Sequence, residues 1–164
     1  MEFEFTLRFQ LSSAISGDEA LERLGAAGCT DVLVGTGVAG KLTMMFCREA
    51  IDAQYAIRRA LDEVAQVLPD AELIEAAPDL VGLTDIAELI GVSRQNMRKL
   101  MLAHSPQFPR PIHDGKTALW HLVDVVEWLN QRGSSRVAPG ISELARATLQ
   151  LNLQQALHRY AHCL

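Results

Sequence analysis

The side chains best suited to chemistry in this chain are grouped between positions 93 and 99. They are Ser93, Arg94, Gln95, Asn96, Arg98 and Lys99. The guanidinium of arginine can donate two hydrogen bonds to the edge of guanine, glutamine and asparagine can pair in a similar way with adenine, and lysine suits a phosphate. This combination predicts that the segment contacts double-stranded DNA.

Two short helices joined by a tight turn are expected to position this group. Thr84 is a suitable N-cap for the first helix and a further candidate for DNA contact, and Gly91 can end that helix because glycine accepts a positive φ. Ser93 is expected to cap a second helix over residues 93–103. On this helix, Met97, Leu100 and Met101 are spaced i, i+3 and i+4, which places them on one buried face. The opposite face then presents Gln95, Arg98, Lys99 and Leu102.

A β-hairpin is predicted after the second helix, over residues 108–120. The Asp114–Gly115 pair lies between extended residues, and this pair favours a tight hairpin turn. Beside a DNA-reading helix such a ribbon is a wing. It would carry Arg110 at its root and Lys116 at its tip, and we expect both to contact phosphate.

Together these segments resemble the AlpA-like and excisionase-like winged helix-turn-helix proteins, which are related to the MerR class. The resemblance covers residues 80–132 and includes an amphipathic helix expected over 122–132. Its motifs are Thr84–Ala87 (TDIA), Gly91–Arg94 (GVSR), Phe108–Pro111 (FPRP), Leu119–Trp120 (LW) and Val126–Leu129 (VEWL). The resemblance implies a bacterial DNA-binding protein of the regulator or recombination-accessory type, with the second helix in the major groove and the wing on the backbone or in the minor groove.

The net charge of −5 is unevenly distributed along the chain. Residues 1–78 carry 6 Lys and Arg against 13 Asp and Glu, residues 79–133 carry 6 against 6, and residues 134–164 carry 3 against 1. Between Leu89 and His113 there are four basic residues and no acidic one, so the predicted DNA face is locally positive. Four charges are a small footprint on DNA, which favours binding as a homodimer or higher homo-oligomer.

Residues 1–78 are expected to form a separate ferredoxin-like domain within an α+β chain. The first strand shows strict alternation of apolar and mainly polar residues, with apolar Phe3, Phe5, Leu7, Phe9 and Leu11. Further helices are expected at 18–27 and 51–68, and further strands at 31–35, 42–46 and 71–76. The resulting order is βαββαβ, and Pro78 marks the boundary with the reader domain, residues 79–133. We expect the first domain to serve in oligomerisation or to bind a protein partner.

A glycine-rich stretch between two of these strands matches two nucleotide-binding patterns. Gly35–Gly40 fits GxGxxG, and Gly35–Lys41 fits GxxxxGK. Both patterns need a helix to follow, because free amides at a helix N-terminus hold the phosphate. Residues 41–47 instead alternate as a strand, and Leu42 stands where a magnesium-binding hydroxyl is needed. One long helix over residues 41–68 is the alternative that would support nucleotide binding; we expect a strand and no cofactor.

Residues 134–164 are expected to form a flexible linker followed by an amphipathic helix from Ser142. The apolar stripe of this helix is Leu149, Leu153, Ala156, Leu157, Tyr160 and Leu164. The stripe either packs on its own domain or forms a dimer interface, and removal of residues 141–164 is expected to leave a folded protein. A metal could use the spacing of His158, His162 and Cys163, but no further ligand is visible, so a surface tail is favoured.

No set of side chains indicates an enzyme, a cofactor site or a metal site. His104, His113 and His121 are scattered and have no nucleophile or carboxylate partner nearby in the sequence. The three cysteines contain no CxxC pair, and no stretch has the length of a membrane span or the pattern of a secretion signal, so a cytoplasmic protein is expected. We predict a site-specific DNA-binding regulator. An excisionase-like factor that bends DNA and an antitoxin-like protein-interaction module are the alternatives.

Overall fold

The computed structural model describes residues 1–29, 32–35, 37–133 and 137–164. Asp31 of an expected strand, Thr36 of the glycine-rich stretch and residues 134–136 of the expected linker lie outside the described residues. The structure is a mixture of helices and antiparallel sheets, which confirms the predicted α+β class. It divides into two compact units: unit 1 is Met1–Ala77 with Gln150–Leu164, and unit 2 is Pro78–Leu149.

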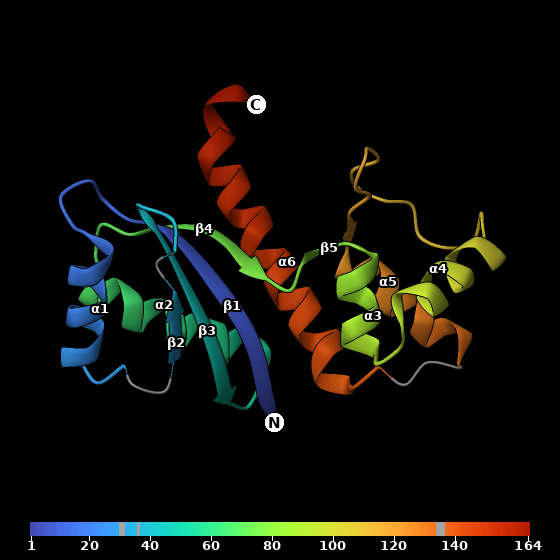
Figure 1. Ribbon diagram of the computed structural model, residues 1–164, viewed down its shortest axis with the longest axis horizontal. Helices are drawn as coiled ribbons and strands as arrows, with labels where there is room; N and C mark the ends of the chain where they lie inside the picture. Colours follow the sequence, from blue (N-terminus) through green and yellow to red (C-terminus); the bar gives the residue numbers. More distant parts are fainter. Residues whose placement is uncertain (30–31, 36, 134–136) are drawn as a thin grey trace. The chain divides into compact units, whose positions relative to one another are not determined.

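Unit 1 is built on a four-stranded antiparallel sheet with the order β2-β3-β1-β4. The strands are β1 (Glu2–Gln10), β2 (Val32–Gly35), β3 (Lys41–Glu49) and β4 (Glu72–Ala77). Helices α1 (Gly17–Ala26) and α2 (Ala53–Val67) cover one face of the sheet (Figure 1). All five alternating apolar residues between Phe3 and Leu11 are buried, so the predicted half-buried strand is confirmed. The elements of this unit also follow the expected order βαββαβ.

The glycine-rich stretch leads into a strand. Gly40 takes a positive φ of 77°, and its carbonyl accepts a hydrogen bond from the Leu11 amide at 2.8 Å. From Lys41 the chain pairs with β1 along the whole of β3, so the alternative of one long helix over residues 41–68 is wrong. No helix N-terminus follows the glycines to hold a phosphate.

Unit 2 packs short helices around one apolar core. It contains β5 (Leu80–Val81), α3 (Leu83–Ile90), α4 (Arg94–Ala103), β6 (Trp120–His121), α5 (Leu122–Arg132) and the first part of α6 (Pro139–Tyr160). The buried cluster is Val81, Ile86, Ala87, Met97, Phe108, Trp120, Leu122, Val123, Val125, Val126, Leu129 and Ala145. Its members come from every helix of the unit, so the position of each helix depends on the others.

The start of α3 differs from the prediction. Gly82, in extended conformation where the chain leaves β5, is the N-cap, and its amide donates to Oδ2 of Asp85 at 3.0 Å. Thr84 therefore lies in the first turn, exposed to solvent, and the expectation that it caps the helix is wrong. The pairing of β5 with β6 ends at Val81, which allows the helix to begin at Leu83, before Thr84 could act as a cap.

The predicted wing is a loop with little strand structure. Its sides are joined by one bridge between His113 and Leu119, and Gly115 has no positive φ, so a tight turn at Asp114–Gly115 is not formed. Trp120 instead pairs with Val81 in the β5-β6 sheet. Pairing across the unit thus replaces the local hairpin pairing expected for this residue.

Helix α6 begins at Pro139, three residues before the expected start, where a proline costs no helical hydrogen bond. Leu144, Ala145 and Thr148 of its first half are buried in unit 2, and the Thr148 hydroxyl donates to the Pro78 carbonyl at 2.6 Å. Removal of residues 141–164 would take Leu144 and Ala145 out of this core, so the burial of α6 argues against the expectation that a chain without the segment stays folded. No helix among the described residues combines the length and apolar character needed to cross a membrane.

Candidate nucleic-acid interface

The second helix of the predicted reader is formed and anchored. Gly91 takes a left-handed conformation with φ of 76° and ends α3, and Oγ of Ser93 accepts the Asn96 amide at 3.1 Å as the N-cap of α4. Both predicted roles are confirmed. Met97 is fully buried, and Leu100 and Met101 pack on the same core from one side of α4. The helix therefore has a defined inner face.

The outer face of α4 carries the polar residues singled out in the sequence. Gln95, Arg98, Lys99 and Leu102 are exposed, and Arg94 and Asn96 are exposed in its first turn. Helical spacing places Gln95, Arg98 and Lys99 on neighbouring turns of one face. The helix contains no acidic residue. It therefore offers a row of hydrogen-bond donors at which a negatively charged surface meets no repulsion from the helix itself.

The basic side chains of this region form no ion pair with another described residue. They are Arg94, Arg98, Lys99, Arg110 and Lys116. Elsewhere in the same unit, Arg146 lies 3.4 Å from Glu127, and Arg132 stacks on Trp128 at 4.8 Å. The contrast matters because an arginine already held by a carboxylate has less capacity to bind phosphate.

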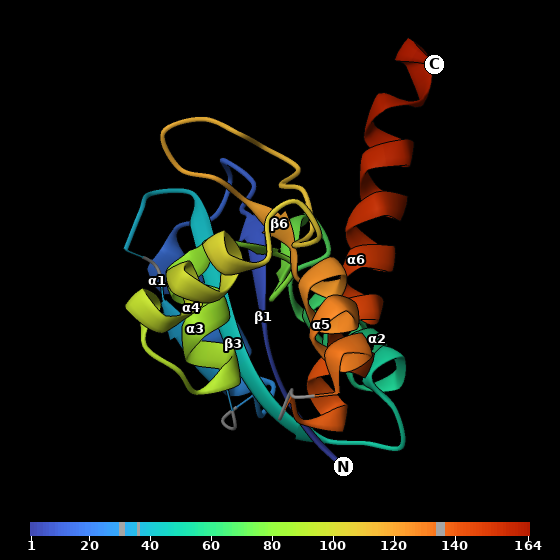
Figure 2. The same ribbon diagram turned by 90° about the vertical axis from the view of Figure 1, so that its right-hand side faces the viewer.

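Arg110 and Lys116 lie on the loop between α4 and β6, which extends beyond the helices of its unit (Figure 2). Both side chains are exposed. Beside Arg110, the Trp120 indole N–H donates to the Pro109 carbonyl at 2.9 Å, and the bridge between His113 and Leu119 encloses Lys116. The loop is thus fixed at its root.

A polar pair at the base of the loop was not predicted from the sequence. Nδ1 of His121 lies 2.7 Å from Oδ1 of Asp79, whose side chain is buried. The Asp79 carbonyl also accepts the Leu122 amide at 2.7 Å. The pair joins the start of β5 to the end of β6, at one end of their sheet, and helps to position the start of α5. Because His121 and Asp79 are 42 positions apart, no local sequence pattern predicts that they meet.

The charge of the two units is opposite in sign. Unit 1 holds 7 Lys and Arg against 13 Asp and Glu, a net −6, whereas unit 2 holds 8 against 7, a net +1. The acidic character of the chain therefore belongs to unit 1. An anionic partner would be attracted to unit 2, through the face of α4.

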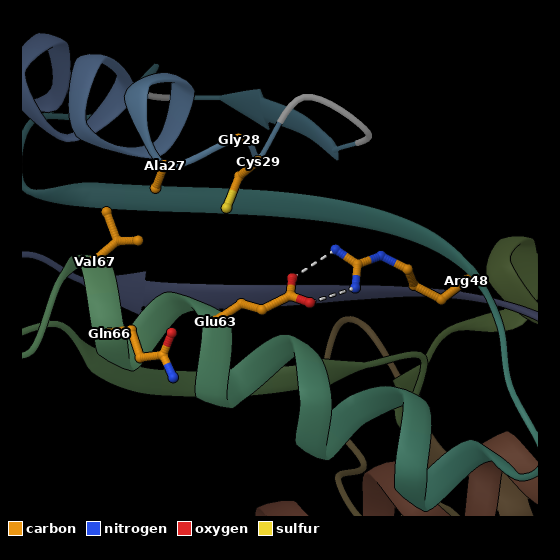
Figure 3. Close-up of a pocket in the computed structure, with 7 residues that line it drawn as sticks. All are labelled: Ala27, Gly28, Cys29, Arg48, Glu63, Gln66 and Val67. Atoms are coloured by element: carbon orange, nitrogen blue, oxygen red, sulfur yellow. Dashed lines mark hydrogen bonds and ion pairs between the residues drawn. The ribbon is translucent and has the colours of Figure 1, made fainter.

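Unit 1 contains a separate pocket of about 400 Å³ between α1, β3 and α2 (Figure 3). Within it the guanidinium of Arg48 donates to both carboxylate oxygens of Glu63, at 3.1 and 2.8 Å. These hydrogen bonds lower the pKa of Glu63 against the opposing effect of desolvation. Cys29 also lines the pocket. Because Glu63 already neutralises Arg48, the pocket offers little attraction to an anionic ligand.

Metal-ligating side chains do not gather at the predicted tail. Within the described part of the chain, ligand atoms of His158, His162 and Cys163 do not converge, and the group that does converge is Glu2, Glu4 and Cys47. Desolvation and these two carboxylates raise the pKa of the Cys47 thiol, which opposes formation of the thiolate that a metal requires.

Comparisons with protein-family models, with curated proteins and with solved structures found no match for this chain.

Proposed function

We propose that the chain is a non-enzymatic, site-specific double-stranded DNA-binding protein and that unit 2 is its reader. The observation that carries the proposal is the outer face of α4. There Gln95, Arg98 and Lys99 are exposed on a helix without acidic residues, and the two basic side chains have no carboxylate partner among the residues that the structure describes. Their hydrogen-bond donors suit the base edges in a major groove, which is wide enough for one helix, and the phosphates that border it.

Within this class, we propose a winged helix-turn-helix regulator of the AlpA-like and excisionase-like type. The order of α3, the Gly91 turn, α4, the loop with Lys116 and α5 supports this assignment. In the proposed complex, α4 lies in the major groove with Gln95 and Arg98 on base edges, while Arg110 and Lys116 contact phosphates.

We also propose that unit 1 is a ferredoxin-like module that serves in oligomerisation. Its βαββαβ order and the strand order β2-β3-β1-β4 support that assignment. A dimer would bring two readers to one DNA site and so double the small basic footprint of a single unit 2.

The strength of binding should depend steeply on salt. If Arg94, Lys99, Arg110 and Lys116 each neutralise one phosphate, the slope of log K against log salt is about −3.6 per reader. Lys116→Ala should reduce the slope by about 0.9 and weaken binding to all sequences alike.

The decisive experiment begins with selection of bound fragments from random duplex DNA by the full chain. Binding of the selected site is then measured by fluorescence anisotropy for the wild type, Gln95→Ala and Arg98→Ala. Each variant should lose about 1–3 kcal/mol of discrimination at one or two base positions. Arg23→Ala removes the same charge from exposed α1 of unit 1 and is the matched control, expected to bind as the wild type does. An unchanged selected motif for both α4 variants, or a chain that enriches no sequence, would refute the proposal.

A further inference from the structure

The polar outer face of α4 contains one large apolar side chain. Leu102 has an exposed fraction of 58%, the highest among the large apolar side chains described in unit 2. It follows Lys99 by three positions and Arg98 by four, and it lies seven positions after Gln95. Helical spacing therefore places these four side chains on one face, with Leu102 beside two cations.

The packing of unit 2 does not account for Leu102. The inner face of α4 is formed by Met97, Leu100 and Met101, which lie in the core or pack against it. Leu102 is not among the described residues that form this core or pack on it. Its side chain is therefore available to a partner that binds the outer face of α4.

The side chains beside Leu102 indicate which partner fits. A purely apolar surface would cover Leu102, but it would also remove Arg98 and Lys99 from water without supplying an acceptor, which is costly for a charged group. Neither cation has a carboxylate partner in the described part of the chain. The major groove of DNA suits the whole face, because phosphates and base edges accept hydrogen bonds while thymine presents a methyl group at C5.

We infer that Leu102 packs on the C5 methyl group of a thymine and is a specificity-determining residue of the reader. The inference rests on the proposed function, because it requires α4 to lie in the major groove. Seven helical residues advance by about 10 Å, which corresponds to about three base pairs along the groove. The DNA site should therefore contain a thymine about three base pairs from the base that Gln95 contacts.

The effect of this contact can be separated from every hydrogen bond of the complex. Deoxyuridine lacks only the C5 methyl group of thymidine, and it keeps the O4 acceptor and the pairing with adenine. Covering one methyl group with an apolar side chain corresponds to about a fourfold change in an equilibrium constant at 25 °C. Replacement of the contacted thymine by deoxyuridine should therefore weaken binding about two- to fourfold.

Fluorescence anisotropy with the full chain and its selected DNA site tests the inference. Each thymine of the site is replaced by deoxyuridine, one position at a time. The wild type should discriminate at one thymine, and Leu102→Ala should bind the thymine and deoxyuridine sites equally. Leu102→Met keeps a long apolar side chain and should retain discrimination. Leu80→Ala shortens another exposed leucine of unit 2, in β5, and should behave as the wild type does.

Urea unfolding followed by tryptophan fluorescence checks that each variant is folded. The inference would be overturned by a wild type that tolerates deoxyuridine at every thymine, or by a selected site that contains no thymine. It would also be overturned if folded Leu102→Ala kept the discrimination, since the methyl group would then act through the shape of the DNA. Failure of the proposed function gives a different result, because the full chain then enriches no sequence at all.

Discussion

Replacement of Met97 by alanine should loosen the whole of unit 2. Met97 is fully buried on the inner face of α4 and joins that helix to the core formed by Ile86, Trp120 and Val126. Removing such a side chain costs about 2–5 kcal/mol, because burial is lost and a cavity is left. Domains of this size are stable by only about 5 kcal/mol. Met97→Ala should therefore leave α4 without a fixed position, while Leu102→Ala, on the exposed face of the same helix, should change stability by at most about 0.5 kcal/mol.

Urea unfolding followed by tryptophan fluorescence measures this effect selectively. The two tryptophans of the chain, Trp120 and Trp128, both belong to unit 2, so their emission follows that unit alone. With a slope of about 1 kcal/mol per molar urea for a small unit, the midpoint for Met97→Ala should fall by about 2 M or more. Equal midpoints for Met97→Ala and Leu102→Ala would show that Met97 does not anchor α4.

Three further predictions concern single hydrogen-bonded groups. Ser93→Ala removes the acceptor for the Asn96 amide and should destabilise unit 2 by about 1 kcal/mol in the same assay; Ser93→Asp should restore stability but weaken DNA binding, and equal stability of all three proteins would contradict the cap. Because the pKa of Glu63 is lower in the folded state than its ordinary value of 4.5, its pair with Arg48 stabilises unit 1 fully above that value, and this stabilisation is lost as the pH falls through the folded pKa. Glu63→Gln should therefore flatten the loss of stability below about pH 5, measured by circular dichroism in urea; an unchanged pH dependence would refute this. Asn152→Ala removes both hydrogen bonds to Ala76 and should speed proteolysis of the end of α6, whereas Gln154→Ala, which breaks no such contact, should not; equal cleavage rates would show that Asn152 does not hold the helix.

The local features of α4 followed from the amino-acid sequence. The cap at Ser93 and the left-handed Gly91 both depend on interactions within a few residues along the chain. The buried alternation from Phe3 to Leu11 follows from the period of a strand that has one face in a core. The chemistry of the candidate site was also visible, because the residues of α4 are consecutive and their types indicate what they can bind.

The tertiary structure decided every feature that required a choice among distant partners. His121 meets Asp79 across 42 positions, Thr148 meets Pro78 across 70, and Asn152 meets Ala76 across 76. No local pattern selects such a partner, since many polar residues could serve equally well until the core brings two of them together. Trp120 illustrates the same principle, because its pairing with Val81 depends on where β5 lies.

The candidate site was likewise predicted in part from the sequence and decided in part by the tertiary structure. Residue types on α4 predicted which side chains could contact DNA, but whether Arg98 and Lys99 were free depended on the positions of all the carboxylates in the folded chain. The role of α6 was likewise open in the sequence, where one apolar stripe extends from Leu149 to Leu164. Folding buries the helix between Leu144 and Thr148 and leaves Leu153 to Leu164 exposed. Periodicity defines an apolar face, and only packing determines how much of that face is covered.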